Sequence, residues 1–318
     1  MHLLAAPDKF RGTLTGREAA AAIAAGAASA GWTATELPLA DGGEGTLDVL
    51  GGGNRRTTVT GPLGHPVEAE WRLEEHGTAL VEAALACGLT LAGGPEGNDP
   101  LAATSRGVGE LVAAAIAEGA ERVVVAVGGV ASTDGGVGAV ETLPTPLPIP
   151  LDIACDVEAR LLDAADVFAP QKGATPEQVL ILRERLAELD LPDIPGSGAA
   201  GGLAAGLAAI GGRLLPGFDL VAERVGLDQH LARAGLVVTG EGRIDATSFS
   251  GKVVGRVLER AAKAGTEVLV VAGDAAPESP TGALSLVERY GPERAFAEPA
   301  KCLAELVANA LATRRNGP

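Results

Sequence analysis

Short apolar runs recur along the chain, end in Gly or Asp, and are followed by Ala-rich stretches. The clearest of them are residues 3–6, 123–127, 236–239 and 268–272. Runs of this length without alternation are typical of strands buried on both faces, as in parallel sheets covered by helices. The pattern therefore predicts an α/β protein.

Between these runs, apolar residues return at helical spacing. We expect helices at residues 17–30, 105–118, 176–189, 252–264 and 301–313. In residues 105–118, Val108, Leu111 and Val112 fall on one face of such a helix. Strands that alternate with helices of this length are typical of βαβ units.

One section breaks the alternation. Residues 57–60, 66–73 and 78–81 predict a β-meander, bounded by the turn pairs Gly61-Pro62 and His76-Gly77. Turn residues at 211–226 precede a renewed β-α alternation. We therefore expect two α/β domains, a discontinuous one formed by residues 1–58 plus 228–318, and a second, residues 59–227, inserted in it.

Charge limits the classes of partner. Asp and Glu number 41 against 25 Lys and Arg, which gives a net charge of -16. Such a surface repels phosphate backbones, and two Trp, one Tyr and five Phe offer little on which to stack bases. We expect no nucleic-acid partner, whereas an anionic metabolite requires a site that is locally basic or bridged by a metal.

The cysteines and the apolar runs bear on location. Cys87, Cys155 and Cys302 are odd in number and far apart, so they form neither a disulfide framework nor a zinc spacing. The run at residues 3–6 is too short for a signal peptide, and no run is long enough for a membrane span. We expect a cytoplasmic protein without a membrane partner.

A first glycine-rich loop, GSGAAG, contains Gly196, Ser197, Gly198 and Gly201 and precedes a helix expected to begin near Ala199. It fits the dinucleotide fingerprint of NAD-dependent oxidoreductases only weakly, because the preceding LDLPDIP has two prolines and two acids where a strand is needed. Two interpretations remain, namely a helix N-terminus that binds phosphate or carboxylate, and close helix packing.

Two further loops place acids and hydroxyl groups among glycines. They are DGGEGT, which begins at Asp41, and GGVASTDGG, which contains Ser132 and Asp134. Open α/β sheets bind ligands at the carboxyl ends of their strands, where both loops are expected. Ordinary turns are the alternative for each.

The segment TGEGRID, residues 239–245, is followed by Gly251-Lys252. It is not a Walker loop, because Ala246 stands where the first Gly is needed and Val253 where the hydroxyl residue is needed. Glu241 and Asp245 remain candidates for a metal ligand or a base, with Arg243 and Lys252 nearby for anionic oxygens. A surface salt bridge among these groups is the alternative.

Basic residues are scarce, yet several lie beside glycine-rich or strand-end segments. These are Lys9, Arg11, Lys172, Arg243 and Lys252. The chain has no G-x-S-x-G elbow, and its four histidines lie outside the glycine loops and lack the spacing of metal ligands. Hydrolase and zinc-enzyme interpretations are therefore disfavoured.

Taken together, the motifs resemble the type-1 glycerate kinase family over nearly the whole chain. The segments that carry the resemblance are APDKFRGTLTGREAAAAIAAG (6–26), LADGGEGT (39–46), TSRGVGEL (104–111), GGVASTDGG (128–136), CDV (155–157), FAPQKGA (168–174), GSGAAGG (196–202) and VVTGEGRID (237–245). The resemblance implies an ATP- and Mg²⁺-dependent kinase of D-glycerate, with a Rossmann-like parallel-sheet domain and an inserted mixed α/β domain. It favours phosphorylation of the 2-hydroxyl, giving 2-phosphoglycerate.

The sequence departs from the family pattern at three places. Val130 replaces a Ser, Ala159-Arg160 replaces Asn-Pro, and the segment between Val140 and Ile153 is short. A kinase of a related small hydroxy acid, and a nucleotide- or carboxylate-binding protein without turnover, stay open as alternatives.

Phosphoryl transfer requires positioning and charge neutralisation more than a covalent nucleophile. We expect Asp245, or alternatively Asp134, to accept the proton of the substrate hydroxyl, and Lys252 or Lys172 to neutralise the transferring group. Asp41 and Glu241 are the candidates for binding Mg²⁺.

The remaining candidates bind the two substrates. For the nucleotide they are Gly196, Ser197, Gly198, Gly201, Lys172 and Glu241. For glycerate they are Asp8, Lys9, Arg11, Arg243 and Ser132. We expect only small-molecule partners, and a monomer or a homodimer.

Overall fold

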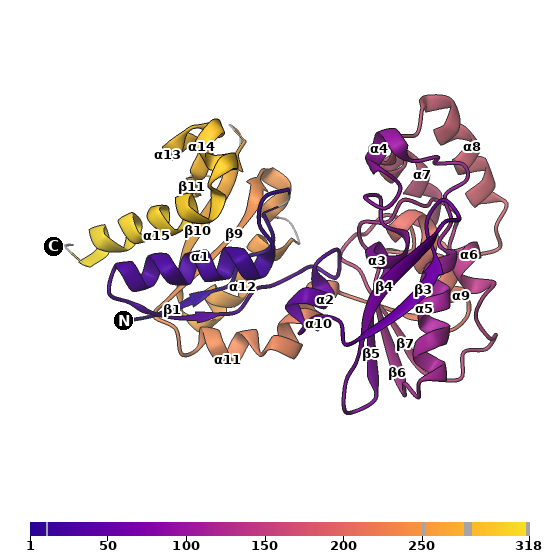
Figure 1. The fold of residues 1–318 in the computed structure, drawn as a ribbon, viewed down its shortest axis with the longest axis horizontal. Coiled ribbons are helices and arrows are strands. Elements are labelled where there is room, and N and C mark those ends of the chain that lie inside the picture. The colour runs from indigo at the N-terminus through magenta and orange to yellow at the C-terminus, as the bar shows by residue number, and fades with distance from the viewer. Residues whose placement is uncertain (11, 250–251, 277–281, 316–318) are drawn as a thin grey trace. The chain divides into compact units, whose positions relative to one another are not determined.

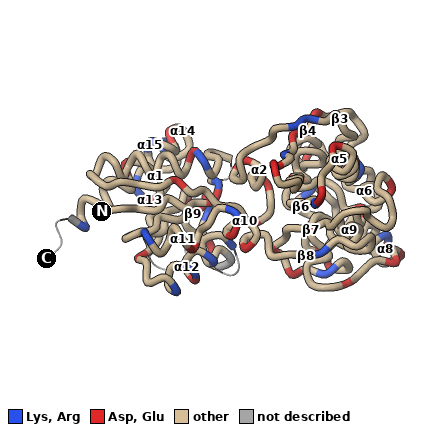
Figure 2. Tube along the Cα trace, turned by 90° about the horizontal axis from the view of Figure 1, so that it is seen from below, with Lys and Arg blue, Asp and Glu red and all other residues tan. Residues whose placement is uncertain are grey.

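The computed structural model describes residues 1–10, 12–249, 252–276 and 282–315. The chain forms two compact units (Figure 1). Unit 1 comprises Met1–Asp41 and Val221–Pro318, and unit 2 comprises Gly42–Leu220. Acidic and basic residues are interspersed along the trace of each unit (Figure 2). Within the described ranges, no helix is long and apolar enough to span a membrane.

Unit 1 contains a five-stranded sheet in which every pairing is parallel. In spatial order its strands are β11 (Leu284–Ser285), β10 (Glu267–Ala275), β9 (Leu236–Ile244), β1 (His2–Ala5) and β2 (Thr33–Glu36). From β1 the chain runs to β2 on one side, and the later strands are added on the other side. The order is that of a doubly wound sheet, whose connections diverge between β1 and β9.

Helices cover this sheet because the strands are apolar toward both faces. They are α1 (Gly16–Ser29), α11 (Leu227–Leu231), α12 (Val253–Ala264), α13 (Leu286–Tyr290), α14 (Pro292–Ala297) and α15 (Pro299–Arg315). A capping box between Thr15 and Glu18 starts α1. Helices α1 and α15 lie side by side (Figure 1), and Ile23 and Val307 are buried with Leu3 and Val238 of the strands.

Unit 2 contains a six-stranded mixed sheet. Its strands, in spatial order, are β3 (Arg55–Thr60), β4 (Pro66–Leu73), β5 (Thr78–Glu82), β6 (Arg122–Ala126), β7 (Leu151–Ala154) and β8 (Arg213–Leu215). β3, β4 and β5 pair antiparallel, and β5 to β8 pair parallel. Trp71, Val125 and Ile153 are buried in its core together with Leu111.

The helices of unit 2 are mostly short. They are α2 (Thr46–Val49), α3 (Ala83–Cys87), α4 (Gly94–Gly97), α5 (Arg106–Ala117), α6 (Val137–Val140), α7 (Ala164–Phe168), α8 (Pro176–Ala187) and α9 (Leu203–Ala209). Helix α10 (Gly217–Val225) contains the boundary between the units. The described residues also form 3-10 turns at Leu161–Asp163, Pro170–Lys172 and Ala199–Gly202 in unit 2 and at Ala246–Phe249 in unit 1.

The predicted α/β class, with one parallel and one mixed sheet, is confirmed. Helix α9 begins at Leu203, not near Ala199 as expected, because Ala200, Gly201 and Gly202 have left-handed backbone conformations. The boundaries between the two units lie at residues 41/42 and 220/221, whereas we expected domain boundaries at 58/59 and 227/228. We propose that the two units are the two domains.

Candidate functional site

Acidic residues of unit 1 gather where the connections of its sheet diverge. Asp8 follows β1, and its backbone N–H donates to the carbonyl oxygen of Gly240 on β9 at 2.9 Å. Asp41 follows β2, after Leu39, whose N–H donates to Pro7 at 2.9 Å. Ligands of open α/β sheets bind at this place, outside the carboxyl ends of the strands.

Strands β9 and β10 extend beyond the edge of the sheet. The last residue of β9 that pairs with β1 is Val238, but its pairing with β10 continues to Ile244. Gly240 permits this extension, because a Cβ there would collide with the backbone carbonyl of Val271. The projecting ribbon carries Glu241 and Arg243, and Asp245 follows directly.

Burial, then the charge of Asp41, then that of Glu241, raise the pKa of Asp8 from 3.8 to about 8. A hydrogen bond from the Lys9 N–H, at 2.7 Å, and the Lys9 charge act in the opposite direction. Burial and the neighbouring carboxylates therefore favour the protonated form of Asp8.

The carboxylate of Glu241 interacts with the rest of this group. Burial raises its pKa, as do the charges of Asp245 and Asp41, while a hydrogen bond with Ser248 and the charge of Lys252 lower it. Its Oε1 atom is buried and has no hydrogen-bond partner in the described part of the chain. We call Asp8, Asp41, Glu241 and Asp245 the acidic cluster.

The acidic cluster is the candidate place for a hard cation. Among the described residues, no group of three or more His, Cys, Asp or Glu side chains is arranged to hold a metal ion. Mg²⁺, however, is usually bound by one or two protein carboxylates, with phosphate oxygens and waters completing its octahedron. The unpartnered oxygen of Glu241 beside the charge of Asp41 fits that requirement.

Basic residues border the acidic cluster. Lys9 is next to Asp8, and Lys252 is exposed at the N-cap of α12. The side chain of the exposed Arg243 forms no hydrogen bond or ion pair with the described residues, and its register partner on β10 is Asp274. Arg11 lies outside the described residues. The structure thus brings together six of the predicted residues: Asp8, Lys9, Asp41, Glu241, Asp245 and Lys252.

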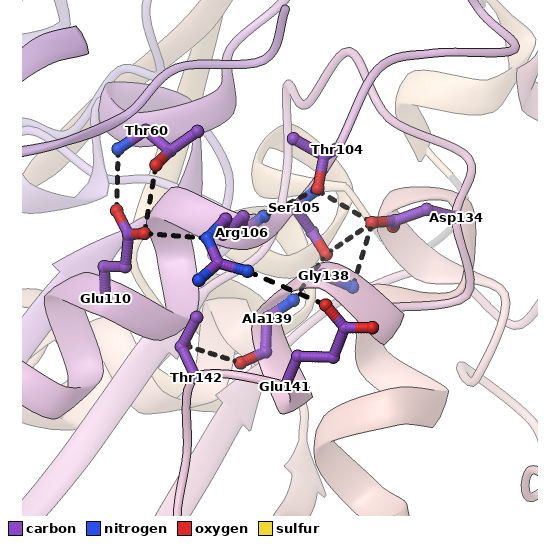
Figure 3. A network of polar contacts seen from close by, with 10 residues as sticks. All are labelled: Thr60, Thr104, Ser105, Arg106, Glu110, Asp134, Gly138, Ala139, Glu141 and Thr142. Atoms are coloured by element: carbon purple, nitrogen blue, oxygen red, sulfur yellow. Dashed lines mark hydrogen bonds and ion pairs between the residues drawn. The ribbon is translucent and has the colours of Figure 1, made fainter. Parts of the chain in front are cut away.

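In unit 2, the carboxylate of Asp134 is already occupied by protein donors (Figure 3). It accepts hydrogen bonds from the N–H and the hydroxyl of Ser105, both at 2.8 Å, and from the N–H groups of Gly136 and Gly138 at 3.1 and 3.3 Å. Asp134 therefore ties the start of α5 to the start of α6.

Lys172 is buried, with 5% of its surface exposed. Its Nζ donates to the carbonyl oxygen of Ser132 at 2.6 Å, and burial lowers its pKa from 10.5 to about 8 against the opposing effects of Cys87 and Asp134. The hydroxyl of Ser132 is also buried. Lys172 thus holds the 128–136 loop in place.

The glycine loop at 196–202 packs against the 128–136 loop. The N–H groups of Ser197, Gly198 and Ala199 donate to Ile194, Ala159 and Gly196. Gly201 accepts from the N–H of Gly135 at 3.0 Å. Several N–H groups expected to be available for phosphate are therefore used within the protein, and close packing accounts for these glycines.

Sequence reasoning missed Ser248, which is fully buried and contacts both Asp245 and Glu241. A signal was present, since a hydroxyl residue three positions after an acid is typical of turns closed by side-chain hydrogen bonds. It also missed Glu82, a buried carboxylate that accepts from the N–H groups of Gly45 and Leu47 at the start of α2.

The chain is similar to known proteins over its whole length. The sequence profile of the Glycerate kinase family matches residues 3–148 and 144–313. An uncharacterized protein of Mycobacterium bovis is 42% identical over 359 residues, with 100% of this chain and 93% of that protein covered. The glycerate 2-kinase of Escherichia coli is 34% identical over 348 residues, with 93% and 90% covered.

A solved structure is similar as well. It is a protein of Salmonella typhimurium LT2 provisionally named glycerate kinase 2, with a TM-score of 0.82 and 32% sequence identity. The alignment covers 100% of this chain and 99% of that one.

Proposed function

Because the chain belongs to the glycerate kinase family, we propose that it transfers a phosphoryl group from ATP to D-glycerate, at the 2-hydroxyl, giving 2-phosphoglycerate and ADP. The observation that carries the proposal is the acidic cluster with its bordering bases, at the diverging edge of the unit 1 sheet. This combination supplies what phosphoryl transfer requires, namely cation binding, a proton acceptor and positive charge for anionic oxygens.

Asp245 is the better candidate for the proton acceptor. The 2-hydroxyl oxygen of glycerate bonds to the terminal phosphorus, the bond from that phosphorus to the oxygen of ADP breaks, and the hydroxyl proton passes to the carboxylate. Asp134 is less suited, because four protein hydrogen bonds already occupy its oxygens. These bonds favour a structural role for Asp134.

Asp41 and Glu241 would hold Mg²⁺ together with the phosphates of ATP. When bound, the ion supplies neutralisation of phosphate charge. The raised pKa of Asp8 favours its protonated form, which can donate a hydrogen bond to an anionic substrate oxygen that a carboxylate would repel. The pKa of Asp8 thus supports its assignment to substrate binding.

Some of the basic residues bind glycerate, and another binds the phosphoryl group that is transferred. Lys9, Arg11 and Arg243 bind the carboxylate of glycerate, and Lys252 neutralises the transferring phosphoryl group. In unit 2, Lys172, Ser132 and the glycine loop (Gly196, Ser197, Gly198 and Gly201) remain candidates for substrate contacts. The burial of Lys172 and Ser132 favours a supporting role, in which they shape the 128–136 loop.

Val130, one of the departures from the family pattern, gives no support to a different substrate. Its side chain is buried in the core of unit 2, with 3% of its surface exposed, and its backbone pairs with Gly88. Replacement of a hydroxyl by an apolar group at such a position changes packing and leaves the binding surface unchanged. D-glycerate therefore stays the preferred acceptor.

ADP release during incubation with ATP, Mg²⁺ and D-glycerate tests the function. L-glycerate, lactate and tartrate serve as comparison acceptors, and calorimetry with ATP serves as the binding control. We expect D-glycerate to be the best acceptor. Faster transfer to another acid would assign a related hydroxy-acid kinase, and ATP binding without ADP release would indicate a binding protein.

A further inference from the structure

We propose that Ser248 is a positioning residue for phosphoryl transfer, whose single hydroxyl fixes the metal-side carboxylate of Glu241 and the turn that carries the base Asp245. The inference rests on the proposed function. It assigns a role to a residue for which neither the motifs nor the charge pattern suggested one.

The contacts of Ser248 are specific to a small hydroxyl side chain. Its Oγ accepts the backbone N–H of Asp245 at 3.1 Å and is hydrogen-bonded to the Glu241 carboxylate. A hydroxyl group can donate one hydrogen bond and can also accept hydrogen bonds through its lone pairs. Here it accepts from Asp245 and donates to Glu241. The side chain is fully buried, and water does not compete for it.

Asp245 is held from two directions. Besides the contact with Oγ, the backbone N–H of Ser248 donates to the carbonyl oxygen of Asp245 at 3.1 Å. Both bonds close the turn directly after β9, so they set the direction in which the chain leaves the strand. That direction determines where the Asp245 carboxylate lies relative to Glu241 on the same strand.

The contact with Glu241 has a complementary effect. The Oε1 atom of this carboxylate is buried without a hydrogen-bond partner among the described residues, so it remains available to a ligand. A hydroxyl that holds the carboxylate fixes the orientation of that oxygen. Loss of groups that orient a metal ligand typically costs about 10–100-fold in metal affinity or activity.

Ser285 offers a matched control. It is also a buried serine of unit 1, with 5% of its surface exposed, and its Oγ accepts a backbone N–H three residues along the chain, that of Glu288, at 3.2 Å. It starts α13 and is not part of the acidic cluster. Ser285→Ala therefore removes an equivalent turn hydrogen bond without touching the candidate site.

The experiment compares wild type, Ser248→Ala, Ser248→Thr and Ser285→Ala. We expect Ser248→Ala to lower kcat about 10–100-fold and to raise the Mg²⁺ concentration needed for half-maximal rate, while the KM for glycerate changes less than about threefold. Calorimetry should show weaker Mg-ATP binding. Ser248→Thr, which keeps the hydroxyl, should recover most of kcat, and Ser285→Ala should lower only the Tm.

A kcat for Ser248→Ala within about twofold of that of Ser285→Ala would overturn the inference. Failure of folded Ser248→Thr to exceed Ser248→Ala would do the same. Should Ser248→Ala not fold, Ser248→Cys replaces it, since a thiol is a weak donor and acceptor of similar size, and the same loss is expected. An inactive wild type would refute the proposed function, whereas an active wild type with an unaffected Ser248→Ala refutes this inference alone.

Discussion

Two carboxylates of this protein, Asp134 and Asp245, lie in different surroundings. Asp134 receives four hydrogen bonds from Ser105, Gly136 and Gly138, and it joins two helices. Figure 3 shows Asp134 with Ser105 and Gly138. Asp245 follows a projecting strand within a cluster of repelling charges. The first arrangement stabilises a fold, whereas carboxylates gathered around a group with a raised pKa, as here around Glu241, are typical of functional sites.

Asp245→Asn should lower kcat about 10²–10⁴-fold, with little change in Tm, because the proposed general base is lost while the shape of the side chain is kept. Asp134→Asn is the comparison. It should lower the Tm, since an amide cannot accept all four bonds, and should reduce kcat less. Steady-state kinetics and thermal unfolding check both variants, and a near-normal kcat for Asp245→Asn would remove it as the base.

Lys172 links a buried charge to the pH dependence of stability. Its pKa is about 8 in the folded protein and 10.5 for the free side chain. Between these pH values the unfolded chain holds a proton that the folded protein has released, so folding stability rises with pH. Below pH 8 the cost of burying the charge is fully present.

We expect the Tm difference between wild type and Lys172→Met to move in favour of wild type from pH 8 to 10.5. The corresponding difference in the free energy of unfolding should change by at most about 1.4 kcal/mol per pH unit. Below about pH 7 the Tm difference should not change with pH. Measurement of both proteins at each pH cancels the other titrating groups. A difference that stays constant across the whole range would show that Lys172 keeps its ordinary pKa.

At the scale of elements, two glycine-rich loops of unit 2 depend on close packing. Gly202 and Gly119 have the same φ of 88°. A Cβ at Gly202 would lie 2.7 Å from the Cα of Gly135, whereas a Cβ at Gly119 would meet nothing within 4 Å. The pair thus separates the cost of the left-handed backbone from the cost of the collision.

Gly119→Ala should destabilise the protein by about 1–2 kcal/mol, the backbone cost alone. Gly202→Ala should destabilise the protein by this backbone cost plus about 1–3 kcal/mol for overpacking. It should also separate the 128–136 loop from the glycine loop. Calorimetric Tm values for the two variants check this. An equal decrease in Tm for the two variants would indicate that contact between the glycine loop and the 128–136 loop does not stabilise the protein.

Periodicity predicted the elements that bury a continuous face. The helices at residues 16–29 and 176–187 and the strands at 66–73 and 122–126 lie within two residues of the expected ranges. The strands β2 and β8 were missed, because β2, TATE, is polar and β8, RLL, has only two apolar residues. The late start of α9 depends on backbone conformations at Ala200 and Gly201 that arise from packing against residues 132–135.

The candidate site was predictable in its residue types and less so in its arrangement. Acids and bases beside strand ends identified Asp8, Glu241 and Asp245, since chemistry gathers at the carboxyl ends of parallel strands. The four hydrogen bonds to Asp134 and the contacts of Ser248 depend on tertiary structure, which spacing along the chain does not encode. Bases such as Lys172 were likewise identified by position, and their burial was not foreseen.

At the scale of the whole molecule, topology assembles the acidic cluster from distant parts of the sequence. Asp8 and Asp41 come from the first segment of unit 1, and Glu241 and Asp245 from the second, with all of unit 2 between them in the chain. A net charge of -16 disfavours anionic ligands in general. We therefore expect the proposed binding of ATP and glycerate to depend on the local bases and on a cation.

We propose that this protein phosphorylates the 2-hydroxyl of D-glycerate, and phosphorus NMR of the reaction product distinguishes this outcome from transfer to the 3-hydroxyl. The 2-phosphate couples to one proton and the 3-phosphate to two. With ATP, Mg²⁺ and D-glycerate, we predict a new doublet that grows as the ATP signals decline. A dominant triplet would place the phosphoryl group on the 3-hydroxyl, and the absence of any new phosphate ester would contradict the kinase assignment itself.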